Sequence, residues 1–274
     1  MKPRDSLGPP IWPLVVATPV VFVLWLLPFL WMVSSSMKTL PELLQAPLAP
    51  LPSGLNFEAY ADTFTTIPLG HYFLNTILMA LGIAVLQILL GLPAAYALSK
   101  LNFSGRKWVF IAVLSTLFLP AQVRFVPTFV LFAELGWVNT MTALILPFAM
   151  SAFGIFWFRQ SMQRIPDEFI EAARLDGASE LRIIFSVLAP LLLPTLAAFL
   201  IFSFVLHYND YFWPLVMTTD DHVRTLPLGV ALLREQGTGV RWNVVMAANV
   251  LLSLPPILVF TFAQRQLLSG VARH

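Results

Sequence analysis

The chain has 274 residues, of which 58% are apolar and only 11% are charged, and its mean hydropathy is +0.80. A soluble domain carries about 25% charged residues, so the composition excludes a water-soluble domain and predicts an all-α polytopic membrane protein. Cysteine is absent, which excludes disulfides, thiolate metal sites and a cysteine nucleophile. The net charge is +2 and no long basic cluster occurs, so nucleic acid is not an expected partner.

Six apolar runs along the chain are long enough to cross a lipid bilayer, which takes about 20 residues in a helix. The first run follows Lys2 and Arg4 and is too long for the apolar part of a signal peptide, and no small-residue cleavage pattern follows it. We therefore expect residues 1–10 to be an N-terminal segment and residues 11–274 to form a single transmembrane domain. The expected spans cover residues 11–33, 71–98, 108–131, 140–158, 187–206 and 243–263.

The basic residues predict which side of the membrane each loop occupies. Six spans put both termini on one side, and 11 of the 16 Lys and Arg residues fall on that side. Because loops rich in Lys and Arg stay in the cytoplasm, we expect both termini and the loop at residues 159–186 to be cytoplasmic. The basic residues on this side are Lys2, Arg4, Lys100, Arg106, Lys107, Arg159, Arg164, Arg174, Arg182, Arg265 and Arg273.

The loop at residues 159–186 has the pattern of a helix, a turn and a second helix. Pro166 with Asp167 and Glu168 predicts a helix start, since proline suits the first turn and acids oppose the positive end of the helix dipole. Gly177 predicts the end of that helix, because glycine adopts the left-handed conformation that closes one. On periodicity alone, an ordinary amphipathic connection is the simpler interpretation of this loop.

The chain lacks the motifs that would give it an energy source or a reaction of its own. It contains no GxxxxGK[ST] phosphate-binding loop, no HExxH zinc pattern and no GxSxG nucleophile turn. Nearly all acids lie in expected loops, whereas an ion-driven carrier usually places carboxylates within the membrane. The sequence thus favours a membrane pore whose energy arrives from outside the chain. The histidines, interpreted as interfacial or solvated, are His71, His207, His222 and His274.

The loop segment Glu171–Gly177 (EAARLDG) is followed nine residues later by Val187–Pro190 (VLAP). This arrangement closely resembles the signature of bacterial ABC-importer permease subunits, EAA followed by three residues and Gly, then nine residues and IxLP, with Val187 and Ala189 as apolar replacements. Three further segments resemble the carbohydrate branch of this family, in its maltose-type and glycerol-phosphate-type members. They are Pro93–Arg106 (PAAYALSKLNFSGR), Asn209–Leu215 (NDYFWPL) and the tail Ala263–Gly270 (AQRQLLSG).

The resemblance implies a type I importer permease fold of six helices with both termini cytoplasmic, in the bacterial inner membrane. It implies that the 159–186 loop couples to a cytoplasmic ATPase, with Glu171 meeting a basic group, Ala172 and Ala173 permitting close approach, Gly177 making the turn, and Asp176 accepting backbone hydrogen bonds there. It implies no cofactor in this chain, since ATP and Mg²⁺ would bind the ATPase. The implied partners are a second permease subunit, two ATPase copies and an extracytoplasmic binding protein.

Polar side chains in or near the expected spans are candidates for the translocation path of a sugar or related polyol. A sugar needs hydrogen-bonding groups and aromatic faces, and Arg124 would also suit a phosphate or another anionic group. Two structural interpretations stay open, because Trp and Tyr commonly form interfacial belts and Asn or Gln commonly joins helices. The candidates are Asn75, Gln87, Gln122, Arg124, Asn209 and Asp210, with Phe125, Tyr208, Tyr211 and Trp213 for stacking.

Two other classes of function remain as alternatives to a permease subunit. An autonomous secondary carrier or channel for small polar solutes would work as this chain alone, driven by an ion gradient. A membrane scaffold would bind partners without ATP-dependent flux. The substrate itself is not specified by any motif in the chain.

Overall fold

The computed structural model describes residues 12–234 and 239–271, with side chains left out at 12–17, 20, 121–122 and 263–271. Every regular element among the described residues is a helix, which confirms the expected all-α class. Packing divides the chain into two compact units, each described here by itself. Unit 1 comprises Met1–Ile67 and Val230–Leu252, and unit 2 comprises Pro68–Gly229 and Ser253–His274. The expected N-terminal segment, with Lys2 and Arg4, lies outside the described residues, as does Arg273.

Unit 1 holds α1 (Trp12–Ser36), α2 (Leu40–Gln45), α3 (Glu58–Thr66) and the first part of α15 (Trp242–Val271). Polar contacts order the segment that follows α1. Trp31 Nε1 donates to the Pro47 carbonyl at 2.8 Å, and the buried Lys38 ammonium donates to the Ala49 carbonyl at 2.5 Å. The expected proline-rich connection is therefore a structured loop with two short helices.

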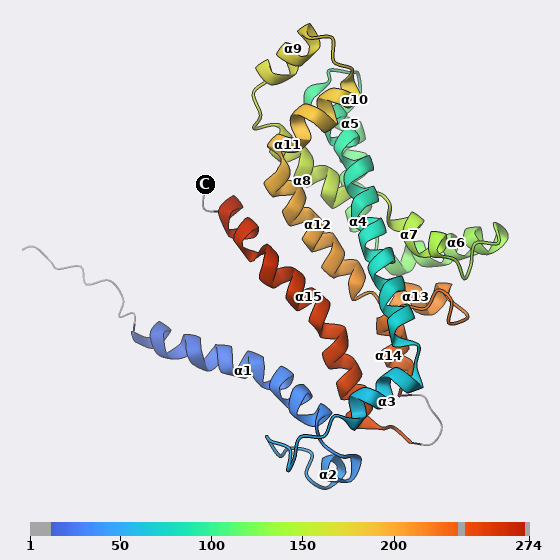
Figure 1. Cartoon of the computed structure of the whole chain (residues 1–274). Helices are drawn as coiled ribbons and strands as arrows, with labels where there is room; N and C mark the ends of the chain where they lie inside the picture. Colours follow the sequence, from blue (N-terminus) through green and yellow to red (C-terminus); the bar gives the residue numbers. More distant parts are fainter. Residues whose placement is uncertain (1–11, 235–238, 272–274) are drawn as a thin grey trace, which may run out of the picture. The chain divides into compact units, whose positions relative to one another are not determined.

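Unit 2 is built around the long helix α4 (Leu69–Lys100), which packs mainly against α8 (Ala152–Met162) and α12 (Leu193–Tyr208) (Figure 1). Its core includes Leu92, Phe158 and Phe199, each at most 1% exposed. Helix α14 (Leu226–Leu232) begins in this unit. Since α4 is apolar along most of its length, burial against two partner helices fixes its position.

Three of the expected spans are pairs of helices with a sharp bend. One pair is α5 (Arg106–Ser115) with η1 (Thr116–Phe118), then α6 (Ala121–Glu134), bent by 97°. A second is α7 (Met141–Ile145) with η2 (Leu146–Phe148), then α8, bent by 46°. Pro120 stands before α6 and Ser151 caps α8, so a residue that starts a new helix accompanies each bend.

Helical structure extends beyond the N-terminal bound of the expected span at residues 187–206. Helical structure begins earlier, at α10 (Glu180–Arg182), and continues through the π-helical turn η3 (Ile183–Leu188) and α11 (Ala189–Leu191). The chain then bends by 87° into α12. Pro190 and Pro194 cannot donate backbone hydrogen bonds, and Pro194 begins the new helix together with Leu193.

Length and composition make α4 and the described part of α15 single candidate spans, and the count rises to five if each bent pair is one span. Within the expected first span, the part of α1 whose side chains are described gives the shorter apolar stretch Val21–Ser36. Six spans therefore remain a prediction, of which the described residues supply five by these criteria.

We predict that Gly154→Ala destabilises unit 2, because the new Cβ would lie 2.7 Å from Cζ of the buried Phe199 ring. That ring is held by Phe158 at 4.7 Å and by Trp157 at 6.1 Å between centroids. Overpacking of this kind costs about 1–3 kcal/mol, which thermal unfolding in detergent would detect as a lower midpoint. Gly70→Ala is the matched control, since nothing lies within 4 Å of its Cβ position; equal midpoints for the two variants would contradict the prediction.

Candidate functional site

The first candidate site centres on α9 (Glu168–Leu175) and the turn that follows it. Gly177 has φ +76°, the left-handed conformation that glycine adopts without strain. The N–H of Gly177 donates to the Arg174 carbonyl and the N–H of Ala178 donates to the Ala173 carbonyl, both at 3.0 Å. This pair of bonds is a Schellman motif. The helix end that the sequence predicts at Gly177 is confirmed, and backbone groups close it without help from the exposed Asp176 carboxylate.

Helix α9 has one face toward its own unit and one face toward solvent. Ile170 is 3% exposed and belongs to the core, and Ala173 and Ala178 pack against that core. Glu171 and Ala172 are exposed, and Leu175 is 89% exposed. The Glu171 carboxylate makes no hydrogen bond or ion pair with any described residue. Of the two alanines in the motif, Ala172 is therefore the one presented outward.

The C-terminal end of α4 anchors α8 and the segment that follows it. The Lys100 ammonium donates to the Ile165 carbonyl at 2.6 Å and to the Asp167 carboxylate at 2.5 Å. Arg159 donates to the Leu98 carbonyl at 3.0 Å. Lys100 is 7% exposed in this contact, and the last carbonyls of a helix and a nearby cation attract one another. The entry into α9 is thus fixed to α4.

Tyr96 and Glu180 hold the C-terminal end of α9 in place through Arg174. Arg174 Nε donates to Glu180 Oε1 at 3.0 Å, and Arg174 Nη2 donates to the Tyr96 hydroxyl at 3.0 Å. The Tyr96 hydroxyl donates in turn to the Glu180 carboxylate. The Arg174 guanidinium, followed by the Tyr96 hydroxyl, holds the pKa of Glu180 below its ordinary value of 4.5. This triad joins α9, α10 and α4, although its members lie far apart in sequence.

A second candidate site is a cavity of about 360 Å³ inside unit 2. Residues of α4, η1, α6, α8 and α12 contribute to its wall, together with the break between η2 and α8. Its size lies at the lower end of the range for small-molecule sites, about 300–1,000 Å³. The wall is mixed, with four Phe rings beside hydroxyl, amide, imidazole and guanidinium groups.

A hydrogen-bonded network forms the polar part of the cavity wall. Ser203 Oγ donates to Gln87 Oε1 at 2.7 Å, and Gln87 Nε2 donates to the Phe148 carbonyl at 2.8 Å. Gln87 Nε2 also lies 3.4 Å from His207 Nε2. This arrangement makes His207 Nε2 the acceptor, so its proton belongs on Nδ1. The network ties α4 to α12 and to the break in the second bent pair.

Of the path residues that the sequence predicts, Gln87 and Arg124 line this cavity. Asn75 donates to the backbone carbonyls of His222 and Arg224 and so holds the outer loop. Asp210 accepts from the N–H of Trp213, which is 6% exposed and donates to the Ala143 carbonyl. Asn209 donates to the Val205 carbonyl. The side chain of Gln122 lies outside the described residues.

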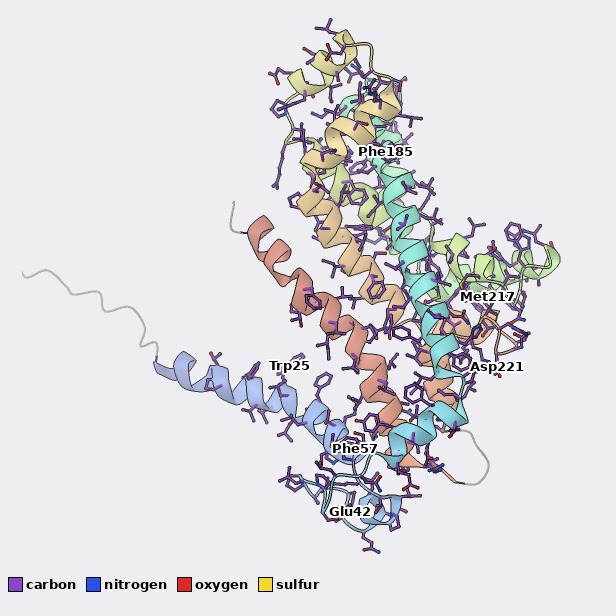
Figure 2. All side chains as sticks on the ribbon, viewed as in Figure 1. Trp25, Glu42, Phe57, Phe185, Met217 and Asp221 are labelled. Atoms are coloured by element: carbon purple, nitrogen blue, oxygen red, sulfur yellow. The ribbon has the colours of Figure 1, made fainter. Side chains whose placement is uncertain are left out.

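The α9 end and the outer-loop end of unit 2 lie at opposite ends of α4. Figure 2 shows Phe185 near the end that carries α9 and α10, and Met217 with Asp221 toward the other end. Tyr72 near the start of α4 donates to Asp221 at 2.6 Å, whereas Tyr96 near its end contacts α10. One helix therefore connects the two polar ends and passes the cavity between them.

The sequence analysis does not predict the triad, and of the three residues in the cavity network it names only Gln87 as a path residue. His207 was expected to be interfacial or solvated, and this is wrong, since it is 7% exposed and its ring lies 5.1 Å from that of Phe148. The expected span ended at residue 206, so His207 was counted in the next loop. The signal was available: Ser203 and His207 stand four positions apart in an apolar run, which places them on one face of a helix.

Apolar helices beside a cavity of mixed polar and apolar lining, with an exposed helix and turn at one end, are the features expected of a membrane permease. A model of the family described as binding-protein-dependent transport system inner membrane component matches residues 87–273. This is more than half of the chain, so the chain belongs to that family of ABC-importer permeases. The resemblance read from Glu171–Gly177 is confirmed, and the chain is a transport subunit, not a catalytic one.

Named relatives span nearly the whole chain. The chain is 37% identical over 237 residues to the sn-glycerol-3-phosphate transport system permease protein UgpE of Pectobacterium atrosepticum, which covers 84% of each sequence. It is 32% identical to the arabinooligosaccharides transport system permease protein AraQ of Halalkalibacterium halodurans, over 95% of this chain and 94% of that one. A crystal structure of a bacterial ABC transporter involved in alginate import is similar with a TM-score of 0.82 and 26% identity, over 96% and 99% of the two chains.

We predict that the contacts of Glu180 with Arg174 and Tyr96 stabilise the folded state at neutral pH, and that this contribution is lost in acid. Because the folded-state pKa of Glu180 is lowered, its contribution is present above the unfolded value of 4.5 and disappears as the pH falls through the lower folded value. The partners are about half exposed, so the effect is at most about 1 kcal/mol. The midpoint difference between wild type and Glu180→Gln should be positive at pH 7 and shrink as the pH falls below the unfolded value and through the lowered folded value of Glu180.

Glu168→Gln provides the matched control for this measurement, because Glu168 is an exposed acid of α9 that makes no side-chain hydrogen bond with a described residue. Its midpoint difference from wild type should be smaller at pH 7 than that of Glu180→Gln. If the midpoint difference between wild type and Glu180→Gln stays constant with pH, the carboxylate charge is not what stabilises these contacts.

Proposed function

We propose that this chain forms one half of the translocation path of an ATP-driven ABC importer for a sugar or related polyol, and that Glu171–Ala178 couples it to a separate ATPase. The observation that carries the proposal is the two-sided placement of α9. Its inner face is fixed to the core and to α4 through Lys100 and Tyr96, while Glu171 and Ala172 face solvent. A helix held rigidly on one side and free on the other is suited to receive a partner and to transmit its movement.

Docking at α9 would use its charge and its apolar side chains together. The unpaired Glu171 carboxylate is available to a basic group of the ATPase, and small Ala172 permits close approach of the two backbones. Leu175 is 89% exposed and Phe169 is 48% exposed, so α9 also offers apolar side chains to a partner. Gly177 would keep the turn in the conformation that presents this surface, and Asp176 lies beside it.

Movement of α9 would reach the cavity through α4. The triad and Lys100 connect α9 to the C-terminal end of α4, and Gln87 in the same helix belongs to the cavity wall. Because packed helices move as rigid bodies, closure of an ATPase dimer would rock the cavity between inward-open and outward-open states. ATP and Mg²⁺ would act only on the ATPase, since this chain has no phosphate-binding loop.

The complete importer would contain four kinds of component in a bacterial inner membrane. Residues 11–274 would form a single permease domain that crosses the bilayer six times and pairs with a second, homologous permease subunit. Two copies of the ATPase would bind the cytoplasmic face. A binding protein would deliver the substrate on the outer face, as the family description implies. Relatives named for glycerol-3-phosphate and arabinooligosaccharides support a sugar or sugar-like substrate.

We predict that Glu171→Ala and Gly177→Asp each reduce ATP-dependent uptake by the reconstituted importer by at least about tenfold, a loss of about 1.4 kcal/mol or more in coupling. Asp at position 177 would be strained at φ +76°. Glu168→Ala is the control, because it removes an acid from the same helix one turn away. Membrane insertion should be unchanged in all three variants.

Full uptake by both coupling variants would refute the coupling role of Glu171–Ala178. Uptake by this chain alone in liposomes, driven by an ion gradient without ATP, would replace the proposal with an autonomous secondary carrier. Assembly of the four components without ATP-dependent flux would instead indicate a membrane scaffold.

A further inference from the structure

The turn between α4 and α5 is a surface feature to which the proposed function gives no role. Residues 102–108 line an open hollow of about 550 Å³ there. Gly105 makes the turn with φ +85°, and nothing lies within 4 Å of its Cβ position. The backbone therefore changes direction beside open space, just before α5 begins at Arg106.

The charge of this hollow has one sign. Arg106 and Lys107 line it, and none of its seven lining residues, all of them described, is an Asp or Glu. Arg106 Nη1 donates to the Leu101 carbonyl at 3.0 Å and so helps to hold the turn. The Lys107 ammonium is exposed and makes no hydrogen bond or ion pair with any described residue. The lining thus offers two cations and supplies no anion to neutralise them.

Arg159 of α8 adds a third cation beside the first turns of α5. The central carbon of its guanidinium lies 4.1 Å from the centroid of the Phe110 ring, and it is close enough to Arg106 for the two positive charges to repel one another. Arg159 donates to the Leu98 carbonyl and forms no ion pair with a described acid. Three cations held by carbonyl groups and a ring give this surface a positive potential, which attracts anions.

An apolar surface begins at the edge of the hollow and continues along α5. Trp108 lines the hollow and is 72% exposed, and Ile111 is 41% exposed. Residues three positions apart share a face of a helix, so these two side chains form one apolar stripe. No residue of α5 is buried, and Phe118, which follows it, is 86% exposed. The charged hollow is therefore continuous with an exposed apolar helix face.

This order of groups matches the order of groups in a phospholipid, from phosphate through glycerol to acyl chains. Tryptophan is enriched at the membrane–water interface, and basic residues just outside a span attract anionic lipids. A soluble anion would use the cations but not the apolar stripe beside them. The chain belongs to a family of inner-membrane components, so lipid is present wherever an apolar helix face is left uncovered.

We propose that the hollow at residues 102–108 binds the headgroup of an anionic phospholipid, whose acyl chains lie along Trp108 and the exposed face of α5. Lys107 binds the phosphate, and Arg106 and Arg159 add the positive charge that selects a net negative headgroup over a zwitterionic one. The inference goes beyond the proposed function, because it concerns the lipid around the chain and not the substrate.

The test uses Trp108 as a reporter in vesicles of phosphatidylcholine that contain a small fraction of brominated lipid. Bromine quenches tryptophan fluorescence on contact, and the brominated lipid is either phosphatidylglycerol or phosphatidylcholine. Each protein is compared with its Trp108→Phe counterpart, so that the difference isolates Trp108 from the other tryptophans. The full chain is measured alone and again in the assembled importer. At equal fractions, brominated phosphatidylglycerol should quench Trp108 more strongly than brominated phosphatidylcholine.

Lys107→Gln should reduce the preference for phosphatidylglycerol by about fivefold, which corresponds to about 1 kcal/mol for one basic residue near an anionic surface. Lys107→Arg keeps the charge and should keep the preference. Arg182→Gln is the matched control, because Arg182 is an exposed cation of unit 2 that lies outside the hollow. Its preference should equal that of the wild type, and inorganic phosphate in the buffer should change none of these values.

Four results would overturn the inference. Equal quenching of Trp108 by the two brominated lipids would leave only an interfacial tryptophan. Equal preference in Lys107→Gln and Arg182→Gln would show that the hollow contributes nothing beyond general attraction to the surface. Loss of the preference in inorganic phosphate would indicate a site for a soluble anion. Quenching of the chain alone that disappears in the assembled importer would show that a partner protein covers the hollow. None of these results bears on ATP-dependent uptake, which tests the proposed function separately.

Discussion

The attachment of α9 to the end of α4 is the constraint on which this end of unit 2 depends. An eight-residue helix such as α9 is too short to be stable alone in water. Its position comes from Ile170 in the core and from Lys100 and Tyr96, which reach it from α4. Tyr96 is buried on the apolar side and bonded to Arg174 and Glu180 on the polar side, so one side chain serves both the core and the triad. Without these contacts, the exposed Glu171 would have no fixed direction.

Helix α4 also explains how two distant sites belong to one mechanism. Near its start α4 holds the outer loop through Tyr72 and Asn75, in its middle it contributes Gln87 to the cavity, and at its end it holds α9. Breaks in the neighbouring helices leave the cavity beside an uninterrupted α4. Backbone that is not helical is tolerated at membrane depth only where it is buried in protein or lines a cavity, and the break before α8 lines this one.

Local patterns predicted those parts of the structure that depend on local physics. Apolar runs gave the helical class, and Pro166 with Gly177 gave the limits of α9 within two residues, because caps act over a single turn. The triad was not predictable in the same way, since Tyr96 and Glu180 are 84 positions apart and only tertiary packing brings them together. The bend before α12 and the inclusion of His207 in that helix have local signals, in Pro190 with Pro194 and in the four-residue spacing of Ser203 and His207, which the boundaries expected from hydropathy alone did not use.

Polar groups in unit 2 differ in whether other groups of the chain complete their hydrogen bonds. The Gln87 amide uses both its oxygen and its nitrogen within the network, and Trp213 donates its indole N–H to a carbonyl; such groups repay their burial through hydrogen bonds and join helices. Arg124 is different, because it is exposed and has no burial cost to offset. The buried network therefore fixes the shape of the cavity by joining helices, whereas Arg124 at its wall joins none.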